Sequence, residues 1–466
     1  MSGGKWILQE LGLQECDPKR ESQKNARVRN SIYCLHPANS DGIRMELPRL
    51  IRVRQNFPVG STLDIRATLE VEFQKLRDRI RPGDHIAVGV GSRGISHLAE
   101  IVASVLEQLI ALGAKPFIIP AMGSHGGATP QGQRDVLASY GITQESMGVP
   151  IRDSLEVRQV GVSMENVPAF CSTDALAADG IVLINRIKPH TDFTGTLGSG
   201  LMKMCVIGLG KRTGATAMHL AATQFGFEIV IRGMARVVLQ NAPILGGVAI
   251  VENQFHDTAR IRVIPLEDIE SDETPLLIEA RSLMPLLPFD EIDLLIVDQM
   301  GKNISGAGMD PNVINRSIHG YSSLPMRGDR TSPFIRRIFV RGLTPETDGN
   351  AIGIGMADAT TTRLVRGTNT QVTYINALTS LTPQSVKVPI AFNTDREAIE
   401  RMLASLPLSN SRNAKVVRIL DTLSVAEMVI SESLWSEKNA SVDWTALGEL
   451  HEMEFDTAEN LISSRK

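Results

Sequence analysis

From residue 84 onward, the chain switches between two hydrophobic patterns. Residues 84–90 ("DHIAVGV") form a short apolar run, a turn follows at 91–94, and residues 95–114 place apolar side chains at helical spacing. The same order returns with the apolar run at 115–122 and the helix-like stretch at 131–141. A repeated strand, loop and helix is typical of a parallel sheet with crossover helices. The pattern therefore predicts an α/β fold.

A third apolar run, at 180–187 ("GIVLINRI"), leads into a glycine-rich loop and then into residues 214–240, which predict one long packed helix. The loops after the three predicted strands all leave carboxyl ends. In open α/β sheets ligands bind in the crevice outside these ends. We therefore expect Arg93, His125, His190 and Lys203 to share one cleft.

The second half of the chain repeats the strand and helix signals. Residues 266–290 are acidic and contain prolines, and an apolar strand-like run follows at 291–299. Further signals lie at 339–365 and 387–406. We predict two α/β domains, residues 1–278 and 279–466, with a cleft between them. The C-terminal end is expected to be an acidic, helical tail.

Composition narrows the class of protein. The chain has 466 residues, 42% of them apolar, and a net charge of −4 without basic runs, which disfavours nucleic acid and anionic membranes as partners. The cysteines, Cys16, Cys34, Cys171 and Cys205, show no CxxC spacing and are interpreted as structural thiols in a reducing compartment. No uncharged apolar segment is long enough for a membrane span. We expect a cytoplasmic protein with a small-molecule partner.

Two histidines occupy predicted strand-end loops. His125 lies among glycines in "GSHGG", and His190 follows Pro189, which restricts the backbone before it. Imidazole titrates near neutral pH, so such a pair could act as opposed acid and base in a reversible reaction. Two unrelated loop histidines would give the same pattern.

Lys203 and His219 are candidates for holding a cofactor. Lys203 lies in an apolar, glycine-rich context, where burial would make its amine nucleophilic, as in lysines that bond covalently to cofactors. A phosphate-binding loop is the alternative, although the GxxxxGK[ST] spacing is absent. His219 has no HxxxH or HExxH context, so it indicates a packed core residue or a lone metal ligand.

Taken together, the motifs "GSRG", "GSHGG", "KPHTDFTGTLGSGLMK", "AMH" and "DQMGK" resemble the nickel-pincer lactate racemase (LarA-like) family across most of the chain. The resemblance implies that Arg93 holds the substrate carboxylate and that His125 and His190 are the acid and base. It also implies that Lys203 carries a covalent nickel pincer nucleotide (nickel on pyridinium-3,5-bisthiocarboxylic acid mononucleotide) and that His219 ligates the nickel. Because the tethered group supplies the other ligands, one histidine is enough.

Further residues match the family's substrate contacts. Ser92 precedes Arg93, and Gln299 and Lys302 follow the predicted strand at 291–299. A polar loop of purely local use is the alternative for the latter two. The resemblance implies racemisation or epimerisation of a 2-hydroxy acid, with the cofactor as transient hydride acceptor and the protein supplying orientation and protons.

The first loop departs from the family pattern. Val90 and Ser92 stand where the family usually has aspartate and threonine, and Gly94 replaces a proline. The loop from His190 to Lys203 is also longer than in lactate-specific members. These changes touch the substrate side, so a larger hydroxy acid, such as a sugar acid, is expected at least as much as lactate.

Two other functions stay open at this stage. One is a hydroxy-acid lyase or dehydratase on the same fold, and the other is a non-catalytic protein that binds the nickel cofactor or an organic acid. As partners we expect a small 2-hydroxy acid and the proteins that make the cofactor, together with a homodimeric assembly.

Overall fold

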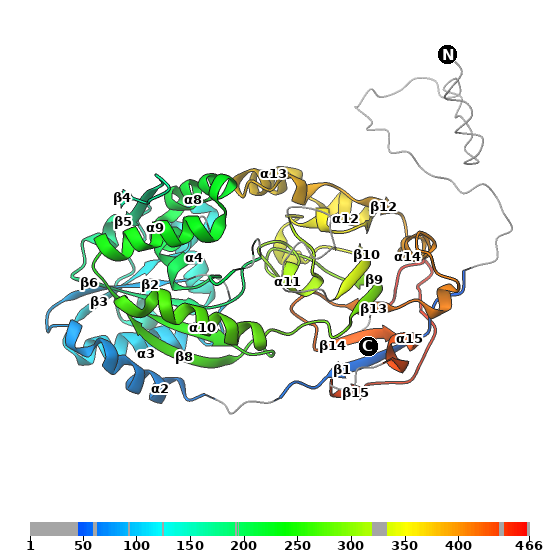
Figure 1. Ribbon diagram of the computed structural model, residues 1–466, viewed down its shortest axis with the longest axis horizontal. Helices are drawn as coiled ribbons and strands as arrows, with labels where there is room; N and C mark the ends of the chain where they lie inside the picture. Colours follow the sequence, from blue (N-terminus) through cyan, green and yellow to red (C-terminus); the bar gives the residue numbers. More distant parts are fainter. Residues whose placement is uncertain are drawn as a thin grey trace, which may run out of the picture. The chain divides into compact units, whose positions relative to one another are not determined.

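The computed structural model describes residues 45–58, 63–91, 94–123, 125–191, 193, 195–318, 333–437 and 442–463. Residues Leu47–Lys466 form one compact unit. Parallel strands alternate with helices in it, which confirms the predicted α/β fold class (Figure 1).

In the described residues, the first sheet has five strands in the order β3-β2-β6-β7-β8. The first four are parallel, and β8 is antiparallel to β7. The strands are β2 (His85–Val90), β3 (Lys115–Pro120), β6 (Gly180–Arg186), β7 (Ile244–Glu252) and β8 (Thr258–Pro265), and β4 (Val157–Val162) pairs with β5 (Pro168–Ser172) in a separate ribbon. The apolar runs predicted at 84–90, 115–122 and 180–187 are confirmed as strands.

Helices cover both faces of this sheet (Figure 1). Ile181 and Leu183 pack in the core beneath α8 and α9, whereas Val182 and Ile184 pack in the core on the side of α2 and α3. The helical segments are α2 (Ile65–Glu72), η1 (Phe73–Arg79), α3 (Leu98–Ala111), η2 (Gly126–Ala128), α4 (Pro130–Ser139), α5 (Gln144–Met147), α6 (Thr173–Leu176), α7 (Leu201–Lys203), η3 (Met204–Gly208), α8 (Lys211–Phe225), α9 (Phe227–Asn241), η4 (Leu266–Asp268) and α10 (Ile269–Ser282). Since both faces are buried, the strands are almost continuously apolar.

One expectation about helices is wrong. Residues 214–240 do not form one helix, because Gly226 adopts a positive φ of 84° and separates α8 from α9. Glycine takes this conformation without a steric penalty. The acidic segment at 266–290 contains α10, a helix that includes Pro275, and the domain boundary expected near it stays a prediction.

The second sheet of the described chain has the order β12-β11-β10-β9-β13-β14-β1-β15. β12 to β13 are parallel, and β14, β1 and β15 are antiparallel to their neighbours. The strands are β1 (Leu50–Gln55), β9 (Glu291–Val297), β10 (Phe334–Val340), β11 (Ala359–Thr361), β12 (Ile390–Phe392), β13 (Val416–Ile419), β14 (Glu427–Ser431) and β15 (Trp444–Ala446). β1 lies within the expected first domain but belongs to this sheet, so the chain contributes to the second sheet before it builds the first. The division into residues 1–278 and 279–466 stays a prediction.

The helices of the second region are short. They are α11 (Pro311–Ile314), η5 (Pro345–Thr347), η6 (Ile354–Met356), α12 (Thr362–Gly367), α13 (Thr370–Thr379), η7 (Pro383–Val386), α14 (Asp395–Ala404), η8 (Ser411–Asn413) and α15 (Glu432–Ser436). The expected helical tail is wrong, since residues 442–463 contain β15 and a bridge between Phe455 and Leu461 but no helix. A packed helix would need a stripe of apolar residues along one face. In this segment single residues, such as Met453 and Leu461, are buried instead.

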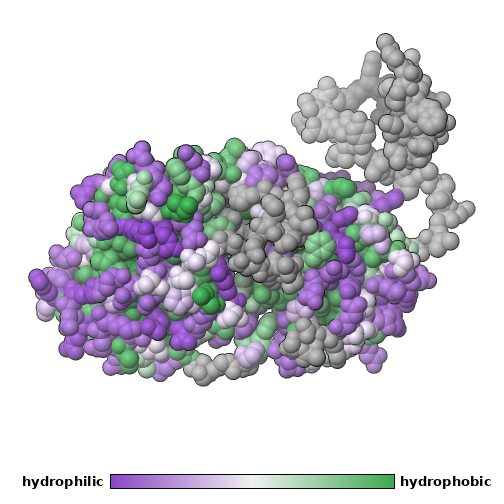
Figure 2. All heavy atoms as spheres, viewed as in Figure 1, coloured by the Kyte–Doolittle hydropathy of each residue, from purple (hydrophilic) through white to green (hydrophobic). Residues whose placement is uncertain are grey.

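The polarity of the surface and the state of the cysteine thiols are those that the sequence composition leads us to expect. On the face in Figure 2, hydrophobic residues are interspersed with hydrophilic ones. Within the described ranges, no helix combines the length and the apolar character that crossing a membrane requires. Cys171 and Cys205 are fully buried free thiols, and burial raises their pKa, which fits the structural role expected for them. Cys16 and Cys34 lie outside the described residues.

Candidate active site

The site lies where the topology of the first sheet changes direction. β2 is flanked by β3 on one side and by β6 on the other, which is the arrangement that opens a crevice at the carboxyl ends. The residues after these strands line a cavity of about 90 Å³. From the strand ends it is lined by Gly91, Met122, His125, Arg186 and Lys188, and Lys203, Met204 and Gly208 complete its wall. The structure thus brings His125 and Lys203 to the same cavity.

His190 pairs directly with Lys203. The imidazole Nε2 of His190 lies 2.7 Å from Nζ of Lys203, and the ammonium also donates to Oγ of Ser199 at 3.3 Å. His190 is only 6% exposed. These two contacts hold the lysine at a fixed place on the cavity wall.

Aromatic rings pack around His190. Its ring stacks on Phe193 with centroids 4.4 Å apart, and Phe193 is nearly parallel to Phe227. His219 on α8 contacts the edge of the same Phe227 at 5.9 Å. The ring of Phe227 thus lies beside both histidines. His219 is not among the residues that line the described cavities. Its assignment as a nickel ligand stays a prediction.

The backbone that carries Lys203 is held by a buried acid. α7 continues into a π-helical turn, η3, a geometry that is frequent at functional sites. Oε2 of Glu273 accepts the N–H of Met202 at 2.9 Å, and burial raises the Glu273 pKa to about 7 although the amides of Met202 and Leu201 lower it. A Cβ on Gly200 would lie 2.3 Å from Oε1 of Glu273, so a larger residue there would displace this carboxylate.

Two buried side chains hold the His125 loop. Gln133 on α4 is fully buried and donates from Nε2 to the carbonyl oxygens of Gly123 and His125 at 2.9 and 3.4 Å. Lys211 donates from Nζ to the carbonyl of Pro120, where β3 ends. Burial lowers the Lys211 pKa to about 8. Sequence reasoning missed Gln133, Lys211 and Glu273, because a polar residue in a helical pattern gives no sign that it is buried.

A second, larger cavity of about 1200 Å³ adjoins the first and is lined from both sheets. His125, Arg186 and Lys188 line it from the first sheet, and Lys302 and Asp310 line it from the second region. Nζ of Lys188 lies 3.8 Å from Oδ2 of Asp310. In addition, Asn312 donates from Nδ2 to the carbonyl of His190 at 3.1 Å, so the second region contacts the His190 loop directly.

The expected substrate contacts have different outcomes. Ser92 and Arg93 lie outside the described residues. Lys302 lines the larger cavity, and Gln299 is not among the residues lining either cavity. Arg186, which sequence reasoning missed, lines both cavities and pairs with the buried carboxylate of Glu252. Its place at the end of an apolar run was a usable signal, the same one that identified His190.

Similarity to known proteins was found among solved structures. No protein-family model matches the sequence, and no curated protein does. Among solved structures, the lactate racemase apoprotein from Thermoanaerobacterium thermosaccharolyticum aligns with 81% of this chain and 99% of its own, at 14% identity and a TM-score of 0.49. A protein from Thermotoga maritima aligns with 71% of this chain and 85% of its own, at 13% identity and a TM-score of 0.46. The chemistry of the site has to be argued from its own residues.

Proposed function

We propose that this protein is a racemase or epimerase of a 2-hydroxy acid, in which Lys203 carries a nickel pincer nucleotide and His125 and His190 exchange the substrate proton. One observation carries the proposal. Nζ of Lys203 lies 2.7 Å from Nε2 of His190, on the wall of a cavity that His125 also lines. An amine and two imidazoles at the carboxyl ends of parallel strands are the groups that this chemistry needs.

The residues fit a tethered group better than a metal held by side chains. Within the described residues, no three His, Cys, Asp or Glu side chains are placed to hold a metal ion. A covalent group that brings its own ligands needs one attachment, Lys203, and one protein ligand, for which we propose His219. When bound, this group supplies a reversible acceptor for the hydride on C2 of the substrate.

The protein's own residues then move the proton and orient the acid. One histidine accepts the proton of the C2 hydroxyl, and the other returns a proton to the same oxygen when the configuration is inverted. General acid–base groups of this kind contribute roughly 10²- to 10⁴-fold in rate. We propose that the substrate carboxylate binds at the junction of the two cavities, where Arg186 and Lys188 lie beside their acidic partners Glu252 and Asp310.

The larger cavity has room for a substrate bigger than lactate. Its volume of about 1200 Å³ exceeds what a six-heavy-atom acid fills, and the tethered nucleotide would occupy part of it. We further propose that the protein acts in the cytoplasm as a homodimer, and that its partners are the proteins that make the nickel cofactor.

C2-deuterated D- and L-hydroxy acids and aldonates test the function. The protein, co-expressed with the proteins that make the cofactor, should invert C2 of at least one acid and keep the deuterium, because the hydride returns internally. A Lys203→Arg variant prepared in the same way should not. Loss of deuterium to solvent, or loss of water from the acid, would contradict the proposal in favour of a proton-abstracting or dehydrating enzyme.

A further inference from the structure

The two walls of the larger cavity carry different chemistry. The wall from the first sheet is ionisable, with His125, Arg186, Lys188, Arg212 and Glu252. The wall from the second region carries the amides and hydroxyls of Asn303, Ser305, Thr347, Asn350, Asn376 and Thr379 beside the charged Lys302, Asp310, Glu346 and Asp348. A ligand that reaches this wall therefore meets many hydrogen-bonding groups.

Asn376 on α13 joins two other residues of the second wall through hydrogen bonds. Its Oδ1 accepts hydrogen bonds from Nζ of Lys302 at 2.6 Å and from Nδ2 of Asn350 at 3.1 Å. Asn350 is itself fixed, because its Oδ1 accepts the N–H of Ile352 at 3.1 Å. Two donors on one oxygen determine which way the Asn376 amide is turned.

The amino group of Asn376 is therefore available to a ligand. Within the described part of the chain Nδ2 of Asn376 has no hydrogen-bond acceptor, and the residue lines the cavity. An amide N–H₂ supplies two donors for hydroxyl oxygens, and the neighbouring hydroxyl of Thr379, which donates to the carbonyl of Ile375, can still accept a hydrogen bond. Such a group discriminates against a ligand that leaves it unpaired.

We propose that Asn376 is a specificity-determining residue that binds hydroxyl groups along the substrate chain, so that the substrate is a polyhydroxylated 2-hydroxy acid of the aldonate type. The inference rests on the proposed function and names its substrate class. The carboxylate and C2 lie at the ionisable wall near His125, and the hydroxylated chain extends to Asn376 and Lys302.

Apolar residues on the same helix offer a competing occupant. Val372 and Ile375 also line the cavity and are 41% and 59% exposed, which would suit an aliphatic acid. An aliphatic chain, however, would cover the amino group of Asn376 without giving it a hydrogen-bond acceptor, and burying such a group unpaired is unfavourable. The amino group of Asn376 therefore favours the hydroxylated substrate.

The experiment compares D-gluconate, lactate and 2-hydroxyoctanoate as substrates of the loaded enzyme and, by calorimetry, as ligands of the unloaded protein. The wild type should prefer gluconate. Asn376→Leu, which keeps the volume but removes the amide, should lower kcat/KM and affinity for gluconate about 10-fold and leave lactate unchanged. Asn376→Ser, which restores a hydroxyl, should recover part of the loss. Gln371→Leu, an exposed residue of α13 that does not line the cavity, is the matched control and should change neither acid.

The outcomes separate this inference from the proposed function. An equal loss for gluconate and lactate in Asn376→Leu would show that the amide only positions Lys302, and would overturn the specificity role. A preference for 2-hydroxyoctanoate, strengthened by Asn376→Leu, would overturn it in favour of an aliphatic substrate. In both cases the proposed racemase stands, whereas binding and inversion of none of the acids would contradict the proposed function itself.

Discussion

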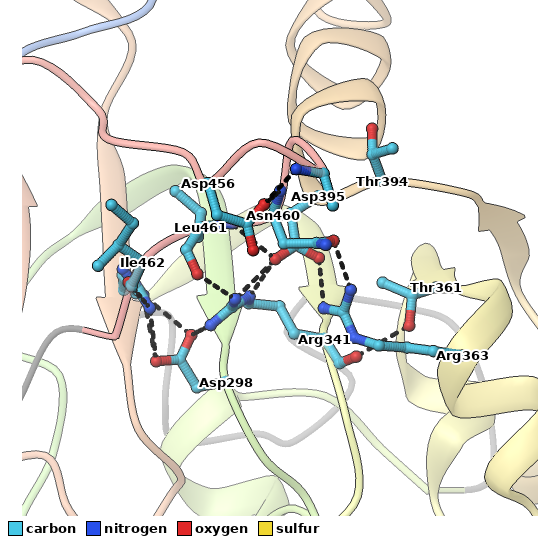
Figure 3. Close-up of polar contacts among 12 residues, drawn as sticks. Asp298, Arg341, Thr361, Arg363, Thr394, Asp395, Asp456, Asn460, Leu461 and Ile462 are labelled. Atoms are coloured by element: carbon cyan, nitrogen blue, oxygen red, sulfur yellow. Dashed lines mark hydrogen bonds and ion pairs between the residues drawn. The ribbon is translucent and has the colours of Figure 1, made fainter.

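The carboxyl ends of the two sheets use charge in opposite ways. In the first sheet the residues that follow the strands line cavities, with His125 and Lys203 on one wall. In the second sheet several charged residues at the strand ends pair with one another (Figure 3), while other residues that follow its strands line the larger cavity. Asp298 accepts two hydrogen bonds from Arg418 at 2.9 Å each, and Arg341 connects Asp298 to the fully buried Asp395. Burial opposes the charge of Arg341, but the two carboxylates overcome this and raise its pKa.

The C-terminal segment closes the second edge (Figure 3). The carbonyl of Leu461 accepts from Nη2 of Arg341 at 2.7 Å, and the carbonyl of Ile462 accepts from Nη2 of Arg418 at 2.8 Å. The N–H of Leu461 donates to Oδ2 of Asp395 at 3.0 Å. The chain's own backbone thus takes the hydrogen bonds that a ligand would otherwise receive.

Topology alone does not decide which edge binds a ligand. β9 lies between β10 and β13 as β2 lies between β3 and β6, so both sheets have a point where a crevice is expected. What differs is where the charges after the strands lie: Asp298, Arg341 and Asp395 pair within one cluster, whereas His125 and Lys203 line a cavity. Function belongs to the site, and we propose that the edge of the first sheet is the reactive one.

The largest expected effect is on turnover at the open edge. His125→Ala should reduce kcat for C2 inversion by roughly 10²- to 10⁴-fold, because it removes one of the two proposed proton carriers. The free energy of unfolding should change by no more than about 0.5 kcal/mol, as measured by urea denaturation. His85→Ala, at the opposite end of β2, should retain turnover. Unchanged turnover in His125→Ala would contradict the proposal that the edge of the first sheet is the catalytic one.

The closed edge should respond in stability. Asp395→Ala should lower the free energy of unfolding by about 3–5 kcal/mol, because it leaves Arg341 without one of its buried partners. Urea denaturation measures the effect, and the exposed Glu449→Ala is the control, with a change within about 0.5 kcal/mol. A loss below about 1 kcal/mol for Asp395→Ala would show that the ion cluster is not structural.

Glu273 sharpens the comparison, because it is a fully buried acid on whose pKa burial has a larger effect than the positive charge of Arg232. Its pKa is raised from 4.5 to about 7, so between these pH values the folded protein binds more protons than the unfolded chain. Stability should therefore fall by about 3 kcal/mol as pH rises through this window. Glu273→Gln should abolish this fall, measured as urea midpoints from pH 5 to 8, whereas Glu279→Gln on the same helix should keep it. A parallel pH profile for Glu273→Gln would refute the assignment.

The smallest effect is expected for an exposed ion pair. Arg54 on β1 donates to Glu427 at 2.6 Å, but both side chains are largely exposed. Arg54→Ala should lower the free energy of unfolding by less than about 1 kcal/mol, and 1 M NaCl should remove the difference. The loss in Asp395→Ala should persist in the same salt, because buried pairs are screened much less. Equal salt sensitivity of the two variants would show that solvent reaches the ion cluster around Asp395.

Local hydrophobic patterns predicted much of the first sheet. The strands at 84–90, 115–122 and 180–187 follow from apolar runs, and the loops after them converge because parallel strands end at the same edge. Position at a strand end was therefore enough to bring His125 and Lys203 together before any distance was known.

Features that depend on residues far apart in sequence could not be predicted. The ion cluster joins Asp298, Arg341, Asp395 and Arg418 with the C-terminal segment, and each of these residues looks like an ordinary surface charge in its own stretch. The break between α8 and α9 depends on the left-handed backbone of Gly226, while other glycines, such as Gly214, lie within helices. Apolar residues keep helical spacing on both sides of Gly226, so the pattern did not show that this glycine separates two helices.

The mass of the peptide that contains Lys203 tests the central claim most directly. The protein should be co-expressed with the proteins that make the cofactor, and its nickel content and peptide masses measured. The account predicts a Lys203 peptide heavier by the mass of the pincer nucleotide, together with bound nickel, and neither in Lys203→Arg. An unmodified Lys203 and no nickel would contradict it.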